Sequence, residues 1–369
     1  MEKFIFKCTN CLETYTPSLN ILECSKCNSP LIVEYIDMKK NSILNDYIPL
    51  PLNRVSNVTL GEGNTPVIKM EKISKLIGLD NLFTKLEFLN PTGSFKDRGS
   101  QIMLSVISEN KIHEIVEDSS GNAGASISAY CARVGVKANI FVPSSAPLAK
   151  VEQIKVYGGN IHKIEGPREN ATIEAFNYCK ENNLIYASHN ASPYFLEGIK
   201  TFAYEVFNQC SNNFPDHIVI PVGNGSLILG TFFGFKELYE AGLINKIPKL
   251  HAAQSANIMP IASAFNGEDW NDSMATHTIA GGISSINPPR KLQILNALKQ
   301  SKGTALAISD KEILRYQKLL STLEGLYIEP TSAVAFAAIE KMFFDKTINI
   351  SENILVPITG LGLKDKPPV

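Results

Sequence analysis

The stretch EIVEDSSGNAGASISAYCARVG, from Glu114 to Gly135, contains the repeating unit from which we predict the fold. A short apolar run is followed by a turn rich in glycine and serine, and then by a longer amphipathic segment. Short β-branched apolar runs are typical of buried strands, and amphipathic segments of ten or more residues are typical of helices. The stretch therefore predicts a strand, a tight loop and a helix, in that order.

The same pattern recurs along the chain. KANIFVPSS at 137–145 is followed by APLAKVEQIKVYGG at 146–159, and DHIVIPVG at 216–223 is followed by NGSLILGTFFGFKELYEAG at 224–242. Strands that alternate with helices in this way form parallel sheets with helices on their faces. Roughly 330 residues of this pattern are more than one sheet needs, so we predict an α/β fold of two lobes with a cleft between them.

The predicted lobes are open parallel sheets with flanking helices. We assign residues 39–89 and 201–369 to a large α/β domain and residues 90–200 to a small one. A separate N-terminal segment, residues 1–38, precedes them.

Composition excludes several classes of partner. The 369 residues carry a formal net charge of -1 without a basic run, which argues against binding to nucleic acid or an anionic membrane. The longest apolar stretches have about ten residues, whereas a membrane helix needs roughly 20. The N-terminus, MEKFIFKCTN, lacks the apolar core and cleavage site of a secretory signal. We therefore expect a cytoplasmic protein.

Four of the seven cysteines form two CxxC pairs that are separated by twelve residues, namely Cys8, Cys11, Cys24 and Cys27. Four thiolates at this spacing suit a tetrahedral zinc ion, and the missing export signal argues against disulfides. Because four thiolates leave no open coordination position, we predict a small zinc ribbon with a structural role. The other three, Cys131, Cys179 and Cys210, are expected to be buried thiols.

Three glycine-containing turns follow strand-like runs: SSGNAG at 119–124, PVGNGS at 221–226 and PITGLG at 357–362. Ligands of open α/β sheets gather at the carboxyl ends of the strands, where these turns lie. The PVGNGS turn opens a helix and predicts an anion cradle of backbone N–H groups. It lacks the Walker lysine and the GxGxxG spacing, which disfavours nucleoside triphosphates and dinucleotides.

A single lysine, Lys96, stands among small residues in FLNPTGSFKDRGS, residues 88–100, at the start of a predicted helix. A solvated lysine needs no such surroundings. A lysine amine, a phosphate cradle and a loop with an amide side chain are the parts that hold pyridoxal 5'-phosphate through a Schiff base.

Five motifs extend this interpretation to a family: NPTGSFKDRG, SSGNAGAS, PVGNG, EPTSA and TGLGLKD. They resemble the fold-type II pyridoxal-phosphate enzymes of the tryptophan synthase β-like superfamily, and specifically the threonine synthase group, from about Leu60 onward. The resemblance implies that Lys96 forms the Schiff base, Asn122 bonds the phenolic oxygen of the cofactor and Thr359 meets the pyridine nitrogen. It implies that four consecutive residues cradle the cofactor phosphate, namely Gly223, Asn224, Gly225 and Ser226. The backbone of the SSGNAG turn would bind the substrate carboxylate through Ser120, Gly121 and Ala123.

The implied function is that of a homodimeric lyase in threonine biosynthesis, which converts O-phospho-L-homoserine and water to L-threonine and phosphate. Lys96 would act as the general base that removes the α-proton of the substrate. Thr359 offers a neutral hydroxyl where an aspartate would stabilise a protonated pyridine, so we expect a moderated electron sink that favours elimination and replacement over transamination.

One segment departs from the family pattern. Threonine synthases carry an arginine in NPYRLEGQKT that grips the substrate phosphate, whereas the segment SPYFLEGIKT, residues 192–201, has Phe195 at that position. Either another cation replaces the arginine, or the substrate lacks a phosphate. The candidate cations are Lys150, Lys155 and Lys200. If phosphate recognition was merely lost at this position, Phe195→Arg should tighten the binding of phosphorylated substrates.

Two alternatives therefore stay open. One is a pyridoxal-phosphate-dependent serine or threonine dehydratase, or a β-replacement enzyme, for which EPTSA at 329–333 also offers a resemblance. In that motif Glu329 either lies near the cofactor or merely precedes a helix that starts with Pro330. The other alternative is a zinc-ribbon pseudoenzyme without turnover, in which Lys96, Asn122 and Thr359 would be dispensable.

Overall fold

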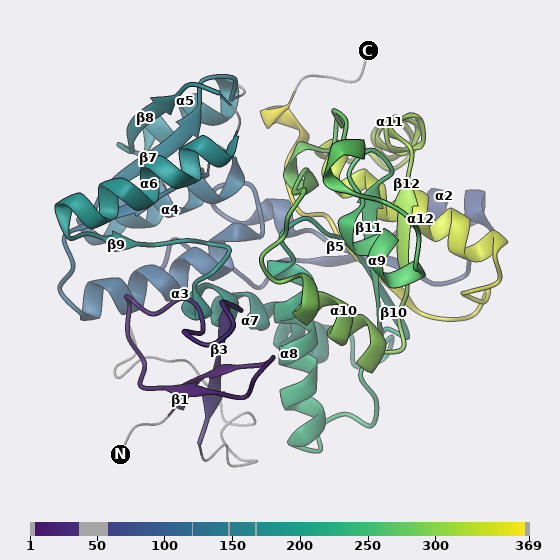
Figure 1. Cartoon of the computed structure of the whole chain (residues 1–369). Coiled ribbons are helices and arrows are strands. Elements are labelled where there is room, and N and C mark those ends of the chain that lie inside the picture. The colour runs from purple at the N-terminus through teal and green to yellow at the C-terminus, as the bar shows by residue number, and fades with distance from the viewer. Residues whose placement is uncertain (1–3, 37–57, 120, 147, 167, 366–369) are drawn as a thin grey trace. The chain divides into compact units, whose positions relative to one another are not determined.

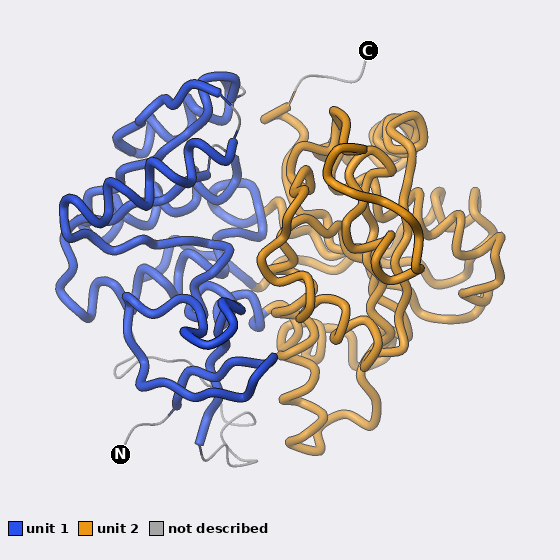
Figure 2. The backbone as a smooth tube through the Cα atoms, viewed as in Figure 1, with its two compact units in different colours: residues 1–63, 90–201 blue, residues 64–89, 202–369 orange. Residues whose placement is uncertain are grey.

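The computed structural model describes residues 4–36, 58–119, 121–146, 148–166 and 168–365. The chain forms two compact units, each made of two segments (Figure 2). Unit 1 contains residues 1–63 and 90–201, and unit 2 contains residues 64–89 and 202–369. The domain roles assigned from the sequence stay predictions, and part of the segment 39–89 lies outside the described residues.

Unit 1 begins with a small antiparallel sheet in the order β2-β1-β3. Its strands are β1 (Phe4–Cys8), β2 (Thr14–Tyr15) and β3 (Leu31–Tyr35). Phe6 of β1 pairs with Tyr15 on one side and with Val33 on the other. The paired CxxC motifs lie at the ends of these strands and in the turns that follow them.

The rest of unit 1 is built on a four-stranded parallel sheet in the order β8-β7-β6-β9 (Figure 1). The strands are β6 (Glu114–Glu117), β7 (Lys137–Pro143), β8 (Asn160–Ile164) and β9 (Ile185–Tyr186). The helices are α3 (Lys96–Glu109), α4 (Asn122–Val134), α5 (Leu148–Val156), α6 (Arg168–Asn182) and α7 (Pro193–Gln209), the last of which continues into unit 2. Helix α6 packs on the sheet, and α3 packs against α4.

Unit 2 is built on a six-stranded sheet in the order β12-β11-β10-β13-β5-β4. The strands are β4 (Val67–Lys69), β5 (Leu82–Lys85), β10 (His217–Pro221), β11 (Lys249–Ser255), β12 (Ala305–Ile308) and β13 (Ile354–Pro357). All neighbouring pairs are parallel except β4 with β5. The prediction of parallel sheets is confirmed, with an antiparallel edge strand added, which is common in such sheets.

Helices cover the unit 2 sheet: α2 (Glu71–Ile77), α8 (Ser226–Glu240), α9 (Pro260–Asn266), α10 (Lys291–Gln300), α11 (Asp310–Leu319) and α12 (Pro330–Phe344). Helix α12 is apolar along most of its length, and its buried face forms the centre of the core with β10, β13 and β5. Burial of this helix from all sides explains why its sequence shows little amphipathic character. Across the described part of the chain, no helix combines the length and apolar character that a membrane crossing requires.

Candidate active site

Hydrogen bonds fix the loop in front of Lys96. Gly93 donates from its N–H to the carbonyl of Asn90 at 2.8 Å, and its φ of 81° is one that favours glycine. The carboxylate of Asp97 accepts from the Thr92 N–H at 2.7 Å and from the Thr92 hydroxyl at 2.5 Å. Lys96, the first residue of α3, is thereby held between two anchored neighbours.

The Lys96 amine lies beside two aromatic rings. Its Nζ is 4.8 Å from the centre of the Phe95 ring and 5.6 Å from that of Phe195, within the range of a cation–π contact. Phe195 is fully buried and lies against Gly99, where a Cβ would come within 2.5 Å of the ring. Nearby in the chain, the buried Ser94 hydroxyl has no hydrogen-bond partner among the described residues. The Lys96 amine thus lies beside the closely packed ring of Phe195.

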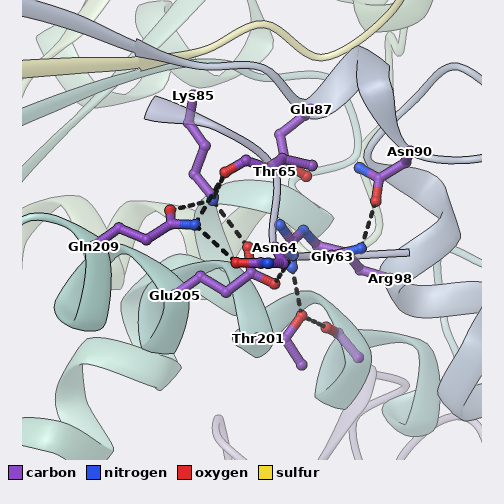
Figure 3. Close-up of polar contacts among 11 residues, drawn as sticks. Gly63, Asn64, Thr65, Lys85, Glu87, Asn90, Arg98, Thr201, Glu205 and Gln209 are labelled. Carbon is purple, nitrogen blue, oxygen red and sulfur yellow. Dashed lines mark hydrogen bonds and ion pairs between the residues drawn. The ribbon is translucent and has the colours of Figure 1, made fainter. Parts of the chain in front are cut away.

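Lys85 in unit 2 is fully buried, and its amine is surrounded by polar groups (Figure 3). Its Nζ lies 2.7 Å from the Thr65 carbonyl, 2.7 Å from Gln209 Oε1 and 2.9 Å from Glu205 Oε2. An ammonium group has three protons, and these three acceptors use all of them. Lys85 is therefore a structural residue, and Lys96 is the candidate for covalent chemistry.

The SSGNAG turn connects β6 to α4, which begins at Asn122. A Cβ on Gly124 would lie 2.0 Å from the Ser119 carbonyl oxygen, so the turn requires glycine there. Among the residues described in this turn, no side chain forms a cap hydrogen bond at Gly121, and the Gly121 N–H donates to the Ser119 hydroxyl at 3.3 Å. Ser120 lies outside the described residues, so its predicted contact with the substrate stays a prediction.

The first turns of α3 and α4 lie side by side. The Ser126 hydroxyl donates to the Ser100 hydroxyl at 2.7 Å, and both side chains are fully buried. Ser100 follows Lys96 by four residues and Ser126 follows Asn122 by four residues, which is about one helical turn in each case. The structure therefore brings together the helix starts that carry Lys96 and Asn122.

A buried acidic cluster that we did not predict lies at the end of β6. Glu117 and the ring Nδ1 of His189 form a hydrogen bond, and Asp118 accepts from the Thr172 hydroxyl at 2.5 Å. Burial raises the pKa of Glu117 well above its usual range and lowers the pKa of His189 well below its own. Because burial disfavours the charged form of both residues, the pair carries no net charge and shares one proton in its hydrogen bond. The signal in the sequence was two acids at the end of an apolar strand.

In unit 2 the predicted phosphate cradle is a glycine turn between β10 and α8. Gly225 has a φ of 87°, and a Cβ on Gly223 would lie 2.9 Å from the Ile283 Cα. The side-chain oxygen Oδ1 of Asn224 accepts a hydrogen bond from the Ser285 hydroxyl at 2.6 Å, and this bond fixes the turn. No side chain of the described residues caps α8, so the peptide N–H groups at its start can bind an anion.

Thr359 follows β13 and is 2% exposed. Its Oγ1 lies 2.8 Å from Glu329 Oε1 and 2.8 Å from Ser332 Oγ. Glu329 precedes α12, whose first residue is Pro330, so the helix-start account of EPTSA holds. The carboxylate also accepts a hydrogen bond from Thr359, the residue that was predicted to meet the pyridine nitrogen.

Two of the cations that could replace the missing arginine are already paired. Lys155 contacts Glu152 at 2.6 Å on the surface, and the buried Lys200 contacts Glu197 at 2.6 Å. Lys150 is 9% exposed. To bind the substrate phosphate, Lys155 and Lys200 would each have to give up the glutamate that they contact. Both are therefore poor substitutes for the arginine.

The four N-terminal thiols converge on one point. The Sγ atoms of Cys8 and Cys27 are 3.5 Å apart, those of Cys11 and Cys24 are 3.4 Å apart, and all four lie within 4.8 Å of one another. Tetrahedral zinc with Zn–S bonds of about 2.3 Å separates its sulfurs by about 3.8 Å. The Tyr15 hydroxyl donates to Cys24 Sγ at 3.2 Å, a bond that would stabilise a thiolate.

Comparison with known proteins now identifies the family. A family model described as pyridoxal-phosphate dependent enzyme matches residues 58–360. The threonine synthase of Methanocaldococcus jannaschii is 35% identical over 323 residues, which cover 87% of this chain and 79% of that enzyme. The threonine synthase of Methanosarcina acetivorans is 33% identical over 377 residues, which cover 98% of this chain and 93% of that enzyme.

Solved structures show the same fold. A structure of maize serine racemase superposes with a TM-score of 0.70 and 24% identity, covering 81% of this chain and 88% of the other. The glycine cradle before α8, the unsatisfied Ser94 hydroxyl and Lys96 at a helix start all fit the cofactor of this family. The chain belongs to the pyridoxal-phosphate-dependent enzymes, and within them it is a threonine synthase-like lyase that acts on a small amino acid.

Proposed function

We propose that this enzyme converts O-phospho-L-homoserine and water to L-threonine and phosphate. The observation that carries this proposal is the similarity to the threonine synthase of Methanosarcina acetivorans, which extends over 98% of this chain. Similarity over nearly the whole length, rather than over the cofactor-binding motifs alone, supports a shared reaction.

Pyridoxal phosphate supplies an electron sink for the carbanion at the substrate α-carbon. We assign Lys96 the task of holding the cofactor through its amine and of removing the substrate α-proton. Its place on the first turn of α3 supports this assignment, because the hydrogen bonds of Gly93 and Asp97 fix the chain on both sides of Lys96. The Asn122 amide would donate to the phenolic oxygen of the cofactor.

The two uncapped helix starts would hold the anionic groups. The N–H groups of Gly223, Asn224, Gly225 and Ser226 would bind the cofactor phosphate. The N–H groups of the SSGNAG turn, at Ser120, Gly121 and Ala123, would bind the substrate carboxylate. In both places the helix dipole favours the negative charge, and no lysine is required.

Phe195 supports a second candidate, in which the substrate carries no phosphate. The ring is fully buried beside Lys96, and both Lys155 and Lys200 are paired with carboxylates. A dehydratase or β-replacement enzyme that acts on serine or threonine would need no phosphate grip. The pseudoenzyme reading is disfavoured, because Lys96 and Asn122 lie on adjacent helix starts that a scaffold would not need.

We further propose that Cys8, Cys11, Cys24 and Cys27 hold a structural zinc ion. The convergence of the four sulfurs and the Tyr15 hydroxyl bond to Cys24 support this assignment. The metal would stabilise the small sheet of β1, β2 and β3, in whose strands Phe6, Leu31 and Val33 are the buried apolar residues apart from Cys8.

Three further assignments are proposals. We expect a homodimer, as the family resemblance implies, and a cytoplasmic location, as the N-terminal sequence suggests. We also retain the domains assigned from the sequence, in which 39–89 and 201–369 form the large cofactor-binding domain and 90–200 form the small α/β domain.

A paired assay tests the function. Purified enzyme is given O-phosphohomoserine in one reaction and threonine or serine in another, with Lys96→Ala as the blank. Phosphate release with the appearance of threonine is the expected result. A 2-oxo acid and ammonia from threonine or serine, without phosphate release, would select the second candidate instead.

A further inference from the structure

The buried pair of Glu117 and His189 lies at the edge of the unit 1 sheet where ligands of such sheets bind. Glu117 is the last residue of β6, and His189 follows the end of β9 by three residues. The two strands are parallel neighbours, and the Ala187 N–H donates to the Val116 carbonyl at 2.8 Å. The carboxyl ends of parallel strands form the ligand-binding edge of an open α/β sheet. The SSGNAG turn leaves from this edge, two residues after Glu117.

The pair also lies close to Lys96. The centre of the His189 ring is 6.0 Å from the centre of the Phe195 ring, and the Lys96 Nζ is 5.6 Å from the centre of that same Phe195 ring. Phe195 stands where the motif that the sequence resembles has a phosphate-binding arginine. His189 therefore borders the place where the substrate side chain is expected.

Hydrogen bonds to Glu117 fix the orientation of the His189 ring. The carboxyl Oε1 forms a hydrogen bond with the ring Nδ1, and Oε2 accepts from the His189 backbone N–H at 3.3 Å. His189 is 6% exposed, and Glu117 is fully buried. Among the described residues, none forms a hydrogen bond with the other ring nitrogen, Nε2. Buried polar atoms are ordinarily hydrogen-bonded, so Nε2 is available to a ligand.

The proton count of the pair makes Nε2 a donor. Burial raises the pKa of Glu117, and the neighbouring Asp118 adds to this effect, so a carboxylate is disfavoured. Burial, followed by the positive charges of Lys96 and Arg168, lowers the pKa of His189, so an imidazolium is disfavoured. A pair without net charge holds two protons. One of them lies in the bond between Oε1 and Nδ1, and the other is on Nε2 whichever of these two atoms holds the shared proton.

We propose that His189 is a substrate-binding residue whose Nε2–H donates a hydrogen bond to an oxygen of the substrate side chain, and that Glu117 is a positioning residue that holds this tautomer. The inference rests on the proposed function, because it assigns a recognition residue to the same site. The oxygen belongs to a phosphate ester or to a hydroxyl group, since both accept a hydrogen bond. A neutral donor fits beside Lys96, where a second buried cation would be desolvated and repelled.

The first measurement is the tautomer of His189 in wild-type holoenzyme that is labelled with ¹⁵N-histidine. A two-dimensional ¹H–¹⁵N spectrum distinguishes a ring nitrogen that carries a proton from one that does not. The His189 signal is assigned by its loss in His189→Gln, or by its nuclear Overhauser contact with the Phe195 ring if that variant does not fold. We expect a proton on Nε2 at neutral pH, and an Nε2 without a proton would overturn the inference.

The second measurement follows the Nε2–H resonance as ligands bind. Lys96→Ala loaded with pyridoxal phosphate lacks the proposed base, so O-phosphohomoserine and L-threonine should bind to it without conversion. A shift with O-phosphohomoserine assigns the bond to a phosphate oxygen, and a shift with threonine assigns it to a hydroxyl. L-α-aminobutyrate, which has the carbon chain of threonine without the hydroxyl, is the control and should leave the resonance in place. A resonance that moves with neither ligand, or equally with the control, would overturn the inference.

Variants of neighbouring residues test the positioning role of Glu117. Glu117→Gln can still donate to Nδ1 and accept from the His189 N–H, so Nε2 should keep its proton. Glu117→Ala leaves Nδ1 without its partner, and the spectrum should show a mixture of tautomers. Thr172→Val removes the hydrogen bond to Asp118 in the same cluster and should leave the tautomer unchanged. Loss of the Nε2 proton in Glu117→Gln, an unchanged spectrum in Glu117→Ala, or a mixture in Thr172→Val would each contradict this role.

Neither measurement needs turnover, so the test separates this inference from the proposed reaction. An Nε2–H that responds to threonine in an enzyme that releases no phosphate from O-phosphohomoserine would refute only the reaction. Phosphate release by an enzyme whose Nε2–H responds to neither ligand would refute only the role of His189.

Discussion

Phe195 stands where the motif that the sequence resembles has an arginine. If phosphate recognition was merely lost here, an arginine should tighten the binding of phosphorylated substrates, but the surroundings of the ring argue against this outcome. The ring is fully buried, its centre is 6.0 Å from the His189 ring and 5.6 Å from the Lys96 Nζ, and it presses on Gly99. A guanidinium in this space would be desolvated next to another cation.

We therefore expect Phe195→Arg to lower the free energy of unfolding by about 3 kcal/mol and to leave the KM for O-phosphohomoserine no lower. Phe195→Leu, which keeps an apolar side chain, is the control and should cost about 1.5 kcal/mol. Urea denaturation and steady-state kinetics measure the two effects. An arginine variant of unchanged stability whose KM falls about tenfold would contradict this account and restore the sequence-based expectation.

Individual residues of the candidate site also differ in how well they can be predicted from the sequence. Lys96 was identifiable because small residues and a proline surround it in a helix-start pattern. The pair of Glu117 and His189 was not, because the two residues are 72 positions apart and meet only when the sheet has formed. The contact between Glu329 and Thr359 could not be predicted for a similar reason, since the two residues are 30 positions apart in the sequence.

At the scale of elements, helix α7 connects the N-terminal ribbon to the surroundings of Lys96. Tyr194 packs against the Phe6 ring at 5.2 Å, and the Tyr35 hydroxyl donates to Glu197 Oε2 at 2.7 Å. Phe195, next to Tyr194 in the same helix turn, faces Lys96. The ribbon therefore contacts the helix whose residue Phe195 lies beside Lys96.

Removal of the metal is expected to loosen α7. Without its proposed zinc ion the ribbon would lose its fold, and α7 would lose its contacts with Phe6 and Tyr35. Amide hydrogen exchange over residues 193–201 should then be about tenfold faster after chelation, which corresponds to about 1.4 kcal/mol of local stability.

Substitutions locate the effect. Tyr35→Phe removes only the hydroxyl bond to Glu197 and should speed exchange in α7 with the metal still bound. Glu34→Gln, one residue earlier, breaks the ion pair with Lys7 and should leave α7 unchanged. Exchange in α7 that does not respond to chelation would mean that the ribbon and the helix are independent.

The elements themselves were largely predictable, because the alternation of apolar runs and amphipathic segments is strong in the segments quoted from the sequence. The antiparallel strand β4 was not, since three residues with little burial give no periodic signal. The docking of the ribbon on α7 was also beyond the sequence, because aromatic contacts between Phe4, Phe6 and Tyr194 depend on tertiary packing.

At the scale of the whole molecule, a buried histidine pair sets the response to acid. His251 accepts from the Thr304 N–H at 3.1 Å, and its other ring nitrogen lies 2.8 Å from His217 Nδ1. Burial lowers the pKa of His251 to about 3. Below pH about 6.5 the His251 imidazole therefore binds a proton in the unfolded chain but stays neutral in the folded chain.

The sign of the pH dependence follows. The stability due to a neutral His251 is fully present above pH about 6.5 and is lost as the pH falls from there toward about 3. At pH 5 the expected loss is about 2 kcal/mol. Urea midpoints at pH 7 and pH 5 measure it. In His251→Gln the urea midpoints at pH 7 and pH 5 should differ less than in the wild type. A substitution at the exposed His113 should leave that difference unchanged. The same pH dependence in both variants would refute the assignment to His251.

The buried amine of Lys85 links separate segments of unit 2. Its amine joins β5 to the Thr65 carbonyl and to the two α7 side chains of Glu205 and Gln209. Lys85→Met should lower the free energy of unfolding by about 3 kcal/mol, because it leaves a partly buried carboxylate without its cation. Lys69→Met, at an exposed position of β4, is the matched control and should change stability by less than about 0.5 kcal/mol. A difference of less than about 1 kcal/mol between the two variants would contradict the structural role of Lys85.

Lys96 lies beside aromatic rings and Lys85 among polar groups, and a comparison of the two lysines tests the account most directly. Borohydride reduction of the holoenzyme fixes the cofactor to the lysine that carries it, and peptide mapping then locates the label. We predict the phosphopyridoxyl group on Lys96, with none on Lys85 and none in Lys96→Ala. Label on Lys85, or undiminished label in Lys96→Ala, would contradict the claim that Lys96 is the cofactor-binding lysine.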